Sequence, residues 1–162
     1  MSFSATARSL DGALRHEVDV NGRHTVTTDE PIELGGTDMG PAPHELLPAM
    51  IASCVSTMIA LYARRRDWRL SDVRVDAVYD GEATPRDVRL TIHLPDGLTD
   101  VQLARLRRVA ETCPVRRALE AGFTFSEEIV LDAPLGAAGR PDLGPEREVE
   151  RRPRNSPAGG LP

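Results

Sequence analysis

The most apolar stretch of the chain spans residues 44–68 and reads HELLPAMIASCVSTMIALYARRRDW. Its apolar residues occur at helical spacing and cover an arc too wide for a surface helix, so we expect a long helix buried on nearly every side. Pro43 suits the first turn of this helix, whereas Pro48 would remove a backbone hydrogen bond from its interior. We therefore expect a bend or a late start. The stretch contains Cys54, one of the two cysteines of the chain.

Alternating apolar residues on both sides of this helix predict strands, and turn signals separate several of them. The strands are expected at residues 3–8, 13–20, 24–29, 73–79, 88–94 and 123–132. Two shorter helices are expected at residues 99–112, with a capping box at Thr99 and Gln102, and at residues 115–122. The order β-β-β-α-β-β-α-α-β predicts an α+β fold in which an antiparallel sheet wraps on the long central helix.

A helix that is apolar all round must be covered on both sides. One sheet of six strands covers one side, and the two short helices are small. A second copy of the chain would complete the burial, so we expect a homodimer with twofold symmetry. The alternative is that the two short helices suffice.

The length of 162 residues favours one domain. We place this domain at residues 1–133. From residue 134 onward the sequence has no periodicity and many Pro, Gly and charged residues. We therefore expect residues 134–162 to form a disordered tail.

Composition excludes several classes of function. The net charge is −5 and the arginines are interspersed with acids, which argues against a nucleic-acid partner. All 20 basic residues are arginine, so no lysine can form a Schiff base. The four histidines lack metal-ligand spacing with the cysteines, and we expect neither a metal nor a cofactor.

The expected compartment follows from the absence of a signal-peptide pattern and of a membrane-spanning pattern in the sequence. The N-terminal residues show no apolar core of a signal peptide. We also find no apolar run of about 18 residues, so we expect no membrane partner. The cytoplasm is the expected compartment, and in a reducing compartment two cysteines are more often reactive or structural thiols than a permanent disulfide.

The two cysteines differ in their predicted surroundings. Cys113 precedes a proline at the start of a helix, where unpaired N–H groups favour a thiolate. Cys54 lies in the middle of a helix, so no helix terminus is expected to assist it. Its activation would need a nearby cation, and arginine is the only permanent one available. Taken alone, both could equally be inert, buried thiols.

Three segments carry a family resemblance. They read GGTDMGPAPHELLPAMIASC, YARRRDWRLSDVRV and ETCPVRRALEAG. In their order and spacing they resemble the OsmC/Ohr family, the osmotically inducible and organic hydroperoxide resistance proteins, and most of all its broad OsmC-like branch. The resemblance covers about residues 3–132.

The resemblance implies an intertwined homodimer of two sheets wrapped around two central helices. It also implies a thiol-dependent peroxidase in oxidative stress defence. Cys54 matches the peroxidatic thiol, which attacks an organic hydroperoxide and becomes a sulfenic acid. Cys113 matches the resolving thiol, which condenses with it to a disulfide. An external dithiol, in some branches a lipoyl group on a carrier protein, would then reduce this disulfide.

Two further residues of the family pattern are harder to place. In classical members an arginine holds the thiolate, and a glutamate fixes this arginine. That glutamate lies ten residues before the reactive cysteine. Here Glu45 stands nine residues before Cys54, about 13.5 Å and half a turn away along a regular helix. Glu45 would serve the site of the other subunit or simply act as an acid in the first turn. Arg23 is the favoured arginine and Arg8 the alternative, while Arg116 is expected to be exposed.

Two other functions fit the same residues. The chain could be a non-catalytic protein that binds a small lipophilic ligand in the apolar cleft around the paired helices. It could also be a redox-responsive structural dimer whose thiols form a disulfide without turnover. A guanidinium within reach of Cys54, and a short distance between the two cysteines, would favour catalysis.

Overall fold

The computed structural model describes residues 2–10, 12–84 and 86–131. The tail expected over residues 134–162 lies outside these ranges. The chain divides into two compact units, and the boundary between them follows Thr124.

The N-terminal part forms a three-stranded antiparallel sheet in the order β1-β2-β3. Its strands are β1 (Ala5–Ser9), β2 (His16–Val20) and β3 (His24–Thr28). Asn21 and Gly22 both have positive φ, 56° and 64°, as the primed turn of a tight hairpin requires. Side chains of β1 and β3 are exposed except for that of Thr28, so this sheet adds nothing to the buried apolar cluster.

The long helix starts late, as Pro48 predicts. A 3₁₀ turn, η2 (Pro43–Glu45), precedes α1 (Leu46–Arg65). Pro48 is therefore the third residue of α1, where a backbone N–H has no partner within the helix in any case. The proline interrupts no hydrogen bond of the helix interior.

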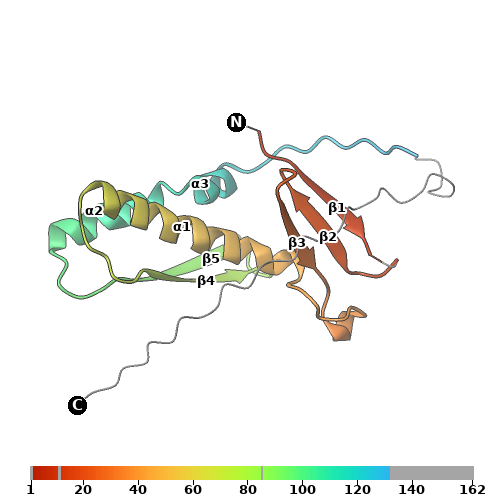
Figure 1. Cartoon of the computed structure of the whole chain (residues 1–162), viewed down its shortest axis with the longest axis horizontal. Helices are drawn as coiled ribbons and strands as arrows, with labels where there is room; N and C mark the ends of the chain where they lie inside the picture. The colour runs from red at the N-terminus through yellow and green to blue at the C-terminus, as the bar shows by residue number, and fades with distance from the viewer. Residues whose placement is uncertain (1, 11, 85, 132–162) are drawn as a thin grey trace, which may run out of the picture. The chain divides into compact units, whose positions relative to one another are not determined.

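A β-hairpin and two further helices pack against α1 (Figure 1). The antiparallel hairpin of β4 (Arg74–Asp80) and β5 (Asp87–His93) covers it on one side, and α2 (Asp100–Glu111) and α3 (Pro114–Ala121) pack along it. Exposure alternates residue by residue along both strands, which confirms the predicted inward faces. The Thr99–Gln102 capping box opens α2, also as predicted.

Burial on α1 differs from the prediction. Within the chain only one face of the helix is buried, at Ile51, Val55, Ile59 and Ala63. The opposite face carries an exposed row that we call the open stripe: Met50, Ser53, Thr57, Ala60 and Leu61. Within a single chain the hairpin and the short helices cover one side of α1 only, so the expected burial on nearly every side would need the second copy and stays a prediction.

The single six-stranded sheet is also wrong. The described strands form two separate sheets of three and two strands. The strand expected at residues 123–132 is absent over 123–131, where Phe125, Ile129 and Leu131 are exposed. Alternating apolar residues make a strand only where a neighbouring edge pairs with the backbone, and no described strand pairs with these residues.

One helix bears on the expectation of no membrane partner. The segment Pro43–Arg65 is long and apolar enough to cross a bilayer by length and composition, contrary to our reading that no such run exists. The core helix of a soluble protein meets the same criterion, so a single helix of this kind is weak evidence for a membrane span.

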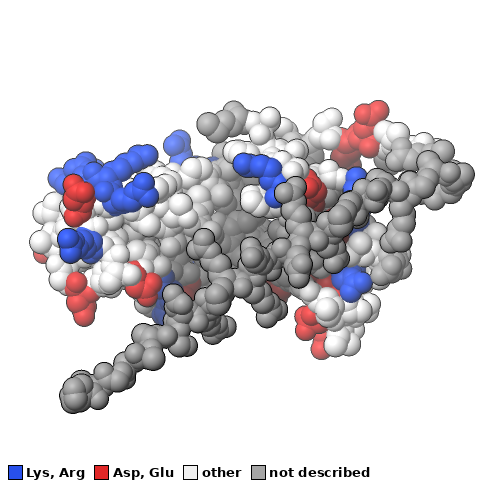
Figure 2. Space-filling model, viewed as in Figure 1, with Lys and Arg blue, Asp and Glu red and all other residues white. Residues whose placement is uncertain are grey.

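Charged and aromatic residues gather at the C-terminal end of α1. Figure 2 shows arginine atoms at the end of the molecule where α2 lies, with carboxylates beside them. At the end of α1, the Arg66 guanidinium lies over the Tyr62 ring, 5.2 Å from the ring centroid. Trp68 meets the same ring edge to face at 5.7 Å. The indole also packs on the buried cluster, so this end of α1 is fixed to the core.

The segment between β3 and α1 is organised by one carboxylate. Asp29 is 1 % exposed, and its oxygens accept hydrogen bonds from the Thr37 hydroxyl and from the backbone N–H groups of Glu30, Thr37 and Met39. The bond from the Thr37 hydroxyl lowers the pKa of Asp29 from its ordinary value of 3.8; burial acts in the opposite sense, and the three N–H groups add to the lowering.

We expect Asp29→Asn to destabilise the protein at pH 7, because an amide cannot accept this set of bonds. A carboxyl whose pKa is lowered by folding adds stability above its unfolded pKa and loses that stability as the pH falls through its folded value. The gap in thermal midpoint between wild type and Asp29→Asn should therefore narrow below about pH 3.8. Asp38→Asn, at an exposed acid of the same loop, is the control. A gap that is constant from pH 7 to pH 3 would contradict the role of the charge.

Candidate functional site

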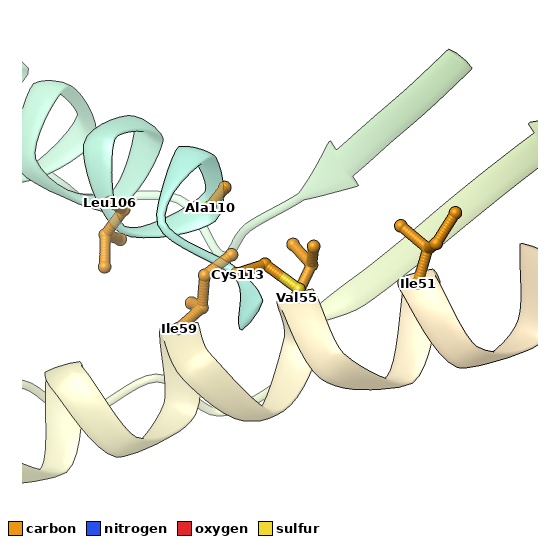
Figure 3. Close-up of a cluster of buried hydrophobic side chains, with 6 residues drawn as sticks. All are labelled: Ile51, Val55, Ile59, Leu106, Ala110 and Cys113. Atoms are coloured by element: carbon orange, nitrogen blue, oxygen red, sulfur yellow. The ribbon is translucent and has the colours of Figure 1, made fainter. Parts of the chain in front are cut away.

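The two thiols of the chain meet where α3 begins. Cys54 is half-buried on α1, and Cys113 is fully buried at the N-cap of α3. The side chain of Cys113 points toward α1 beside Val55 (Figure 3). Cys113 lies close enough to Cys54 to raise the pKa of its thiol, and both cysteines are free. The two sulfur atoms are therefore neighbours in the reduced protein.

The short connection between α2 and α3 places Cys113. The backbone N–H of Cys113 donates to the carbonyl of Ala110 at 3.3 Å and closes the end of α2. Pro114 then opens α3 at a position that needs no N–H donor. Leu106 and Ala110, from the last turns of α2, share the buried cluster with Ile59 of α1. Packing of α2 on α1 therefore delivers the second thiol to the first.

The electrostatics of Cys54 combine opposing effects. Burial raises the pKa of the Cys54 thiol above its ordinary value of 9.0, and the hydrogen bond and charge interaction with Cys113 raise it further. The backbone N–H of Val115 acts in the opposite sense and lowers the pKa. Among the described residues, no arginine contributes to the shift. In the single chain, the neutral thiol is thus favoured.

The effect of the Val115 N–H shows that the start of α3 assists Cys54, contrary to the sequence-based expectation. The sequence suggested that the start of α3 would favour a thiolate at Cys113 and that no helix terminus would assist Cys54. Instead, an amide in the first turn of α3, which has no partner within that helix, bonds to Cys54. The Cys113 side chain caps none of the N–H groups of α3. The packing of α3 on α1 brings the Val115 N–H to Cys54. No local sequence pattern indicates this contact.

Glu45 and Arg23 are not brought to the thiols by any interaction among the described residues. The Glu45 carboxylate accepts the backbone N–H of Ala42 at 2.9 Å, which is the expected role of an acid at a helix start. Arg23 is exposed in the turn before β3, where its backbone N–H donates to Val20. The catalytic roles of Glu45 and Arg23 stay predictions.

A cavity lined by residues of α1, β5 and α3 includes residues that the sequence patterns did not indicate. Its volume is about 450 Å³, and Ile51, Val88 and Leu119 form part of its apolar wall. Arg116, expected to be exposed, is half-buried at this wall and forms an ion pair with Glu120 at 2.7 Å. The spacing of Arg116 and Glu120, one helical turn apart, is the signal that could have indicated the pair.

Two adjoining free thiols, one half-buried and one enclosed, on an α+β core of helix and hairpin define a dithiol protein with the potential for reversible oxidation. The family model of the OsmC-like proteins matches residues 36–128, more than half of the chain. The chain belongs to the OsmC-like protein family. No curated protein matches it by sequence.

Solved structures of similar proteins agree with this assignment. One is an organic hydroperoxide resistance protein OsmC from Legionella pneumophila, described as a predicted redox protein and regulator of sulfide bond formation. Its sequence is 27 % identical and the TM-score is 0.56; the match covers 74 % of this chain and 89 % of that one. A candidate osmotic stress induced and detoxification response protein from Psychrobacter arcticus is 25 % identical with a TM-score of 0.60, over 70 % and 85 %. A candidate organic hydroperoxide resistance protein from Vibrio cholerae, with captopril in one of its active sites, is 25 % identical with a TM-score of 0.51, over 74 % and 84 %.

We expect mild oxidation with diamide to join Cys54 and Cys113 within one chain, because the two thiols are near enough to influence each other's charge. Intact mass would fall by the mass of two hydrogen atoms, and peptide mapping would locate the bond. Cys54→Ala and Cys113→Ala are the controls and should show no such loss. Disulfides found only between chains would contradict the expected pairing.

Proposed function

We propose that this protein is a thiol-dependent peroxidase that reduces organic hydroperoxides in oxidative stress defence, acting in the cytoplasm. The observation that carries the proposal is the contact between half-buried Cys54 and enclosed Cys113. The family and its organic hydroperoxide resistance members support the same assignment. The exposure of the two thiols supports Cys54 as the peroxidatic thiol and Cys113 as the resolving thiol, because Cys54 is half-buried and Cys113 is fully buried.

In the first step, the Cys54 thiolate attacks the outer oxygen of the hydroperoxide. The S–O bond forms and the O–O bond breaks, the alkoxide takes up a proton and leaves as the alcohol, and Cys54 becomes a sulfenic acid. Cys113 then attacks the oxidised sulfur, and the S–S bond forms as water leaves. An external dithiol, which we propose to be a lipoyl group on a carrier protein, reduces the disulfide and is itself oxidised.

The raised pKa of Cys54 disfavours the thiolate on which the proposed reaction depends. The N–H of Val115 is the stabilising group for the thiolate within the chain, and burial outweighs it. We propose that a guanidinium from a second copy, Arg23 or else Arg8, completes the site, with Glu45 orienting it. Both arginines are exposed on the three-stranded sheet and its turn, where a second copy can use them.

The proposed second copy also accounts for the open stripe of α1. Ser53, Thr57 and Ala60 are small, so a second helix could approach closely along them, and Met50 and Leu61 would gain burial. The exposed faces of the N-terminal sheet support the same conclusion. We therefore propose a homodimer whose central contact is α1 against α1.

We expect Cys54→Ser to abolish the consumption of cumene hydroperoxide with dihydrolipoamide as the reductant, because serine cannot be oxidised to a sulfenic acid. Cys113→Ser should stop after one turnover with a sulfenic acid that dimedone labels, measured by peroxide assay and by mass spectrometry. Circular dichroism of each variant checks the fold. Equal rates for wild type and Cys54→Ser would reject the peroxidase and favour a binding or redox-structural protein.

We expect sedimentation equilibrium to give the mass of a dimer, twice the 17.6 kDa chain. Thr57→Arg places a long charged side chain in the middle of the open stripe and should shift the protein toward the monomer. Thr91→Arg, the same change at an exposed position of β5, should leave the dimer intact. A monomeric wild type, or a Thr57→Arg variant as dimeric as wild type, would reject the interface.

A further inference from the structure

Another cavity, which we call the basic groove, lies between the last turns of α1 and the segment that connects this helix to β4. It is lined by residues 56, 60, 63, 64 and 68–73. Its volume of about 480 Å³ falls within the range of pockets that hold small organic molecules. The Ser56 hydroxyl donates to the carbonyl of Val73 at 3.3 Å and ties the connecting segment to the helix.

The basic groove is separate from the thiols. Arg64, one of its lining residues, follows Cys54 by ten residues of the same helix. Ten residues of an α-helix correspond to a rise of about 15 Å. Neither cysteine lines the groove. A ligand held there would therefore take no part in the chemistry at sulfur.

The charged residues of the basic groove leave a net positive charge. They are Arg64, Arg69 and Asp72, and all three are exposed. Within the described part of the chain, neither guanidinium forms an ion pair with a carboxylate. Arg66 differs from them, because its guanidinium lies over the Tyr62 ring. Two guanidinium groups are thus available to an anion in the groove.

Backbone donors line the same groove. The N–H of Trp68 still donates to the carbonyl of Ala63, at 3.0 Å. Residues 69–73, which follow it, belong to neither a helix nor a strand, and none of their N–H groups donates to a residue that the structure describes. The indole N–H of Trp68 likewise has no acceptor among the described residues. Successive free backbone N–H groups are a common component of anion sites.

The rest of the wall is apolar and rigidly held. Trp68, Leu70 and Val73 are half-buried and pack on the buried cluster. An apolar group of a ligand would gain burial against them. A phosphate group presents three acceptor oxygens and close to two negative charges, whereas a carboxylate presents two oxygens and one charge. Phosphate therefore matches two guanidinium groups and a run of N–H donors better than carboxylate does.

We propose that the basic groove binds a small organic phosphate monoester. Arg64 and Arg69 hold the phosphate together with the free N–H groups of residues 69–73, and the apolar wall contacts the organic group. The site is independent of the peroxidase reaction. Ala60 belongs both to the groove and to the open stripe, so the proposed second copy would border the site. The full-length protein in its native oligomeric state is therefore the form to test.

Calorimetry with phenyl phosphate, benzoate and inorganic phosphate tests the proposal on the reduced protein, without any turnover. Phenyl phosphate shares its ring with benzoate and its anionic group with inorganic phosphate. We expect phenyl phosphate to bind about tenfold more tightly than benzoate, because it engages more charged hydrogen bonds. It should also bind more tightly than inorganic phosphate, because its ring gains burial. Binding should weaken as salt is raised.

Matched variants locate the site. Arg64→Gln and Arg69→Gln should each weaken the binding of phenyl phosphate about tenfold. Arg65→Gln removes an exposed arginine next in sequence that does not line the groove, and should bind like wild type. Asp72→Asn removes the one negative charge of the lining and should strengthen binding. Circular dichroism checks the fold of each variant.

Three results would overturn the proposal: no binding of phenyl phosphate at millimolar concentration, benzoate bound as tightly as phenyl phosphate, or Arg64→Gln and Arg69→Gln variants that bind like Arg65→Gln. Cys54→Ser should bind phenyl phosphate like wild type, and a loss of binding in this variant would place the ligand at the thiols instead. Failure of the peroxidase is detected separately by the turnover assay. A protein that binds phenyl phosphate in this way without peroxide turnover would keep this proposal and reject the enzymatic one.

Discussion

The packing of the α2–α3 junction on one face of α1 is the interaction on which the site depends. Val55, Ile59 and Leu106 are almost fully buried there, and each such side chain contributes about 1.5–3 kcal/mol relative to exposure. The exposed ion pairs of the chain, such as Arg74–Asp76, are each worth no more than about 1 kcal/mol. Apolar burial therefore holds the two thiols together, and the exposed ion pairs add little to it.

The same packing sets the chemical state of Cys54. Proximity to Cys113 makes a disulfide possible, but burial and the second thiol both raise the pKa of Cys54 and so disfavour its anion. The amide of Val115 offsets this only in part. A nearby positive charge would act in the same sense as this amide and lower the pKa of Cys54 further.

Local patterns in the sequence predicted the parts of the fold that local forces decide. The alternation around Val75 and Ile92 gave the inward faces of β4 and β5, and Pro48 gave the late start of α1. Features that depend on tertiary contacts were missed. The buried carboxylate of Asp29 and the amide of Val115 at Cys54 require elements that are distant in the chain, so no residue spacing reveals them.

The single tryptophan allows the end of α1 to be monitored in solution by fluorescence. Trp68 is the only indole in the sequence, and it lies where the end of α1 meets the core, against Tyr62 and within reach of the buried cluster. Its emission is therefore a built-in optical reporter of that junction. Light absorbed at the red edge of the protein spectrum excites this one side chain, so loosening of the helix end can be watched in the native chain without an attached dye.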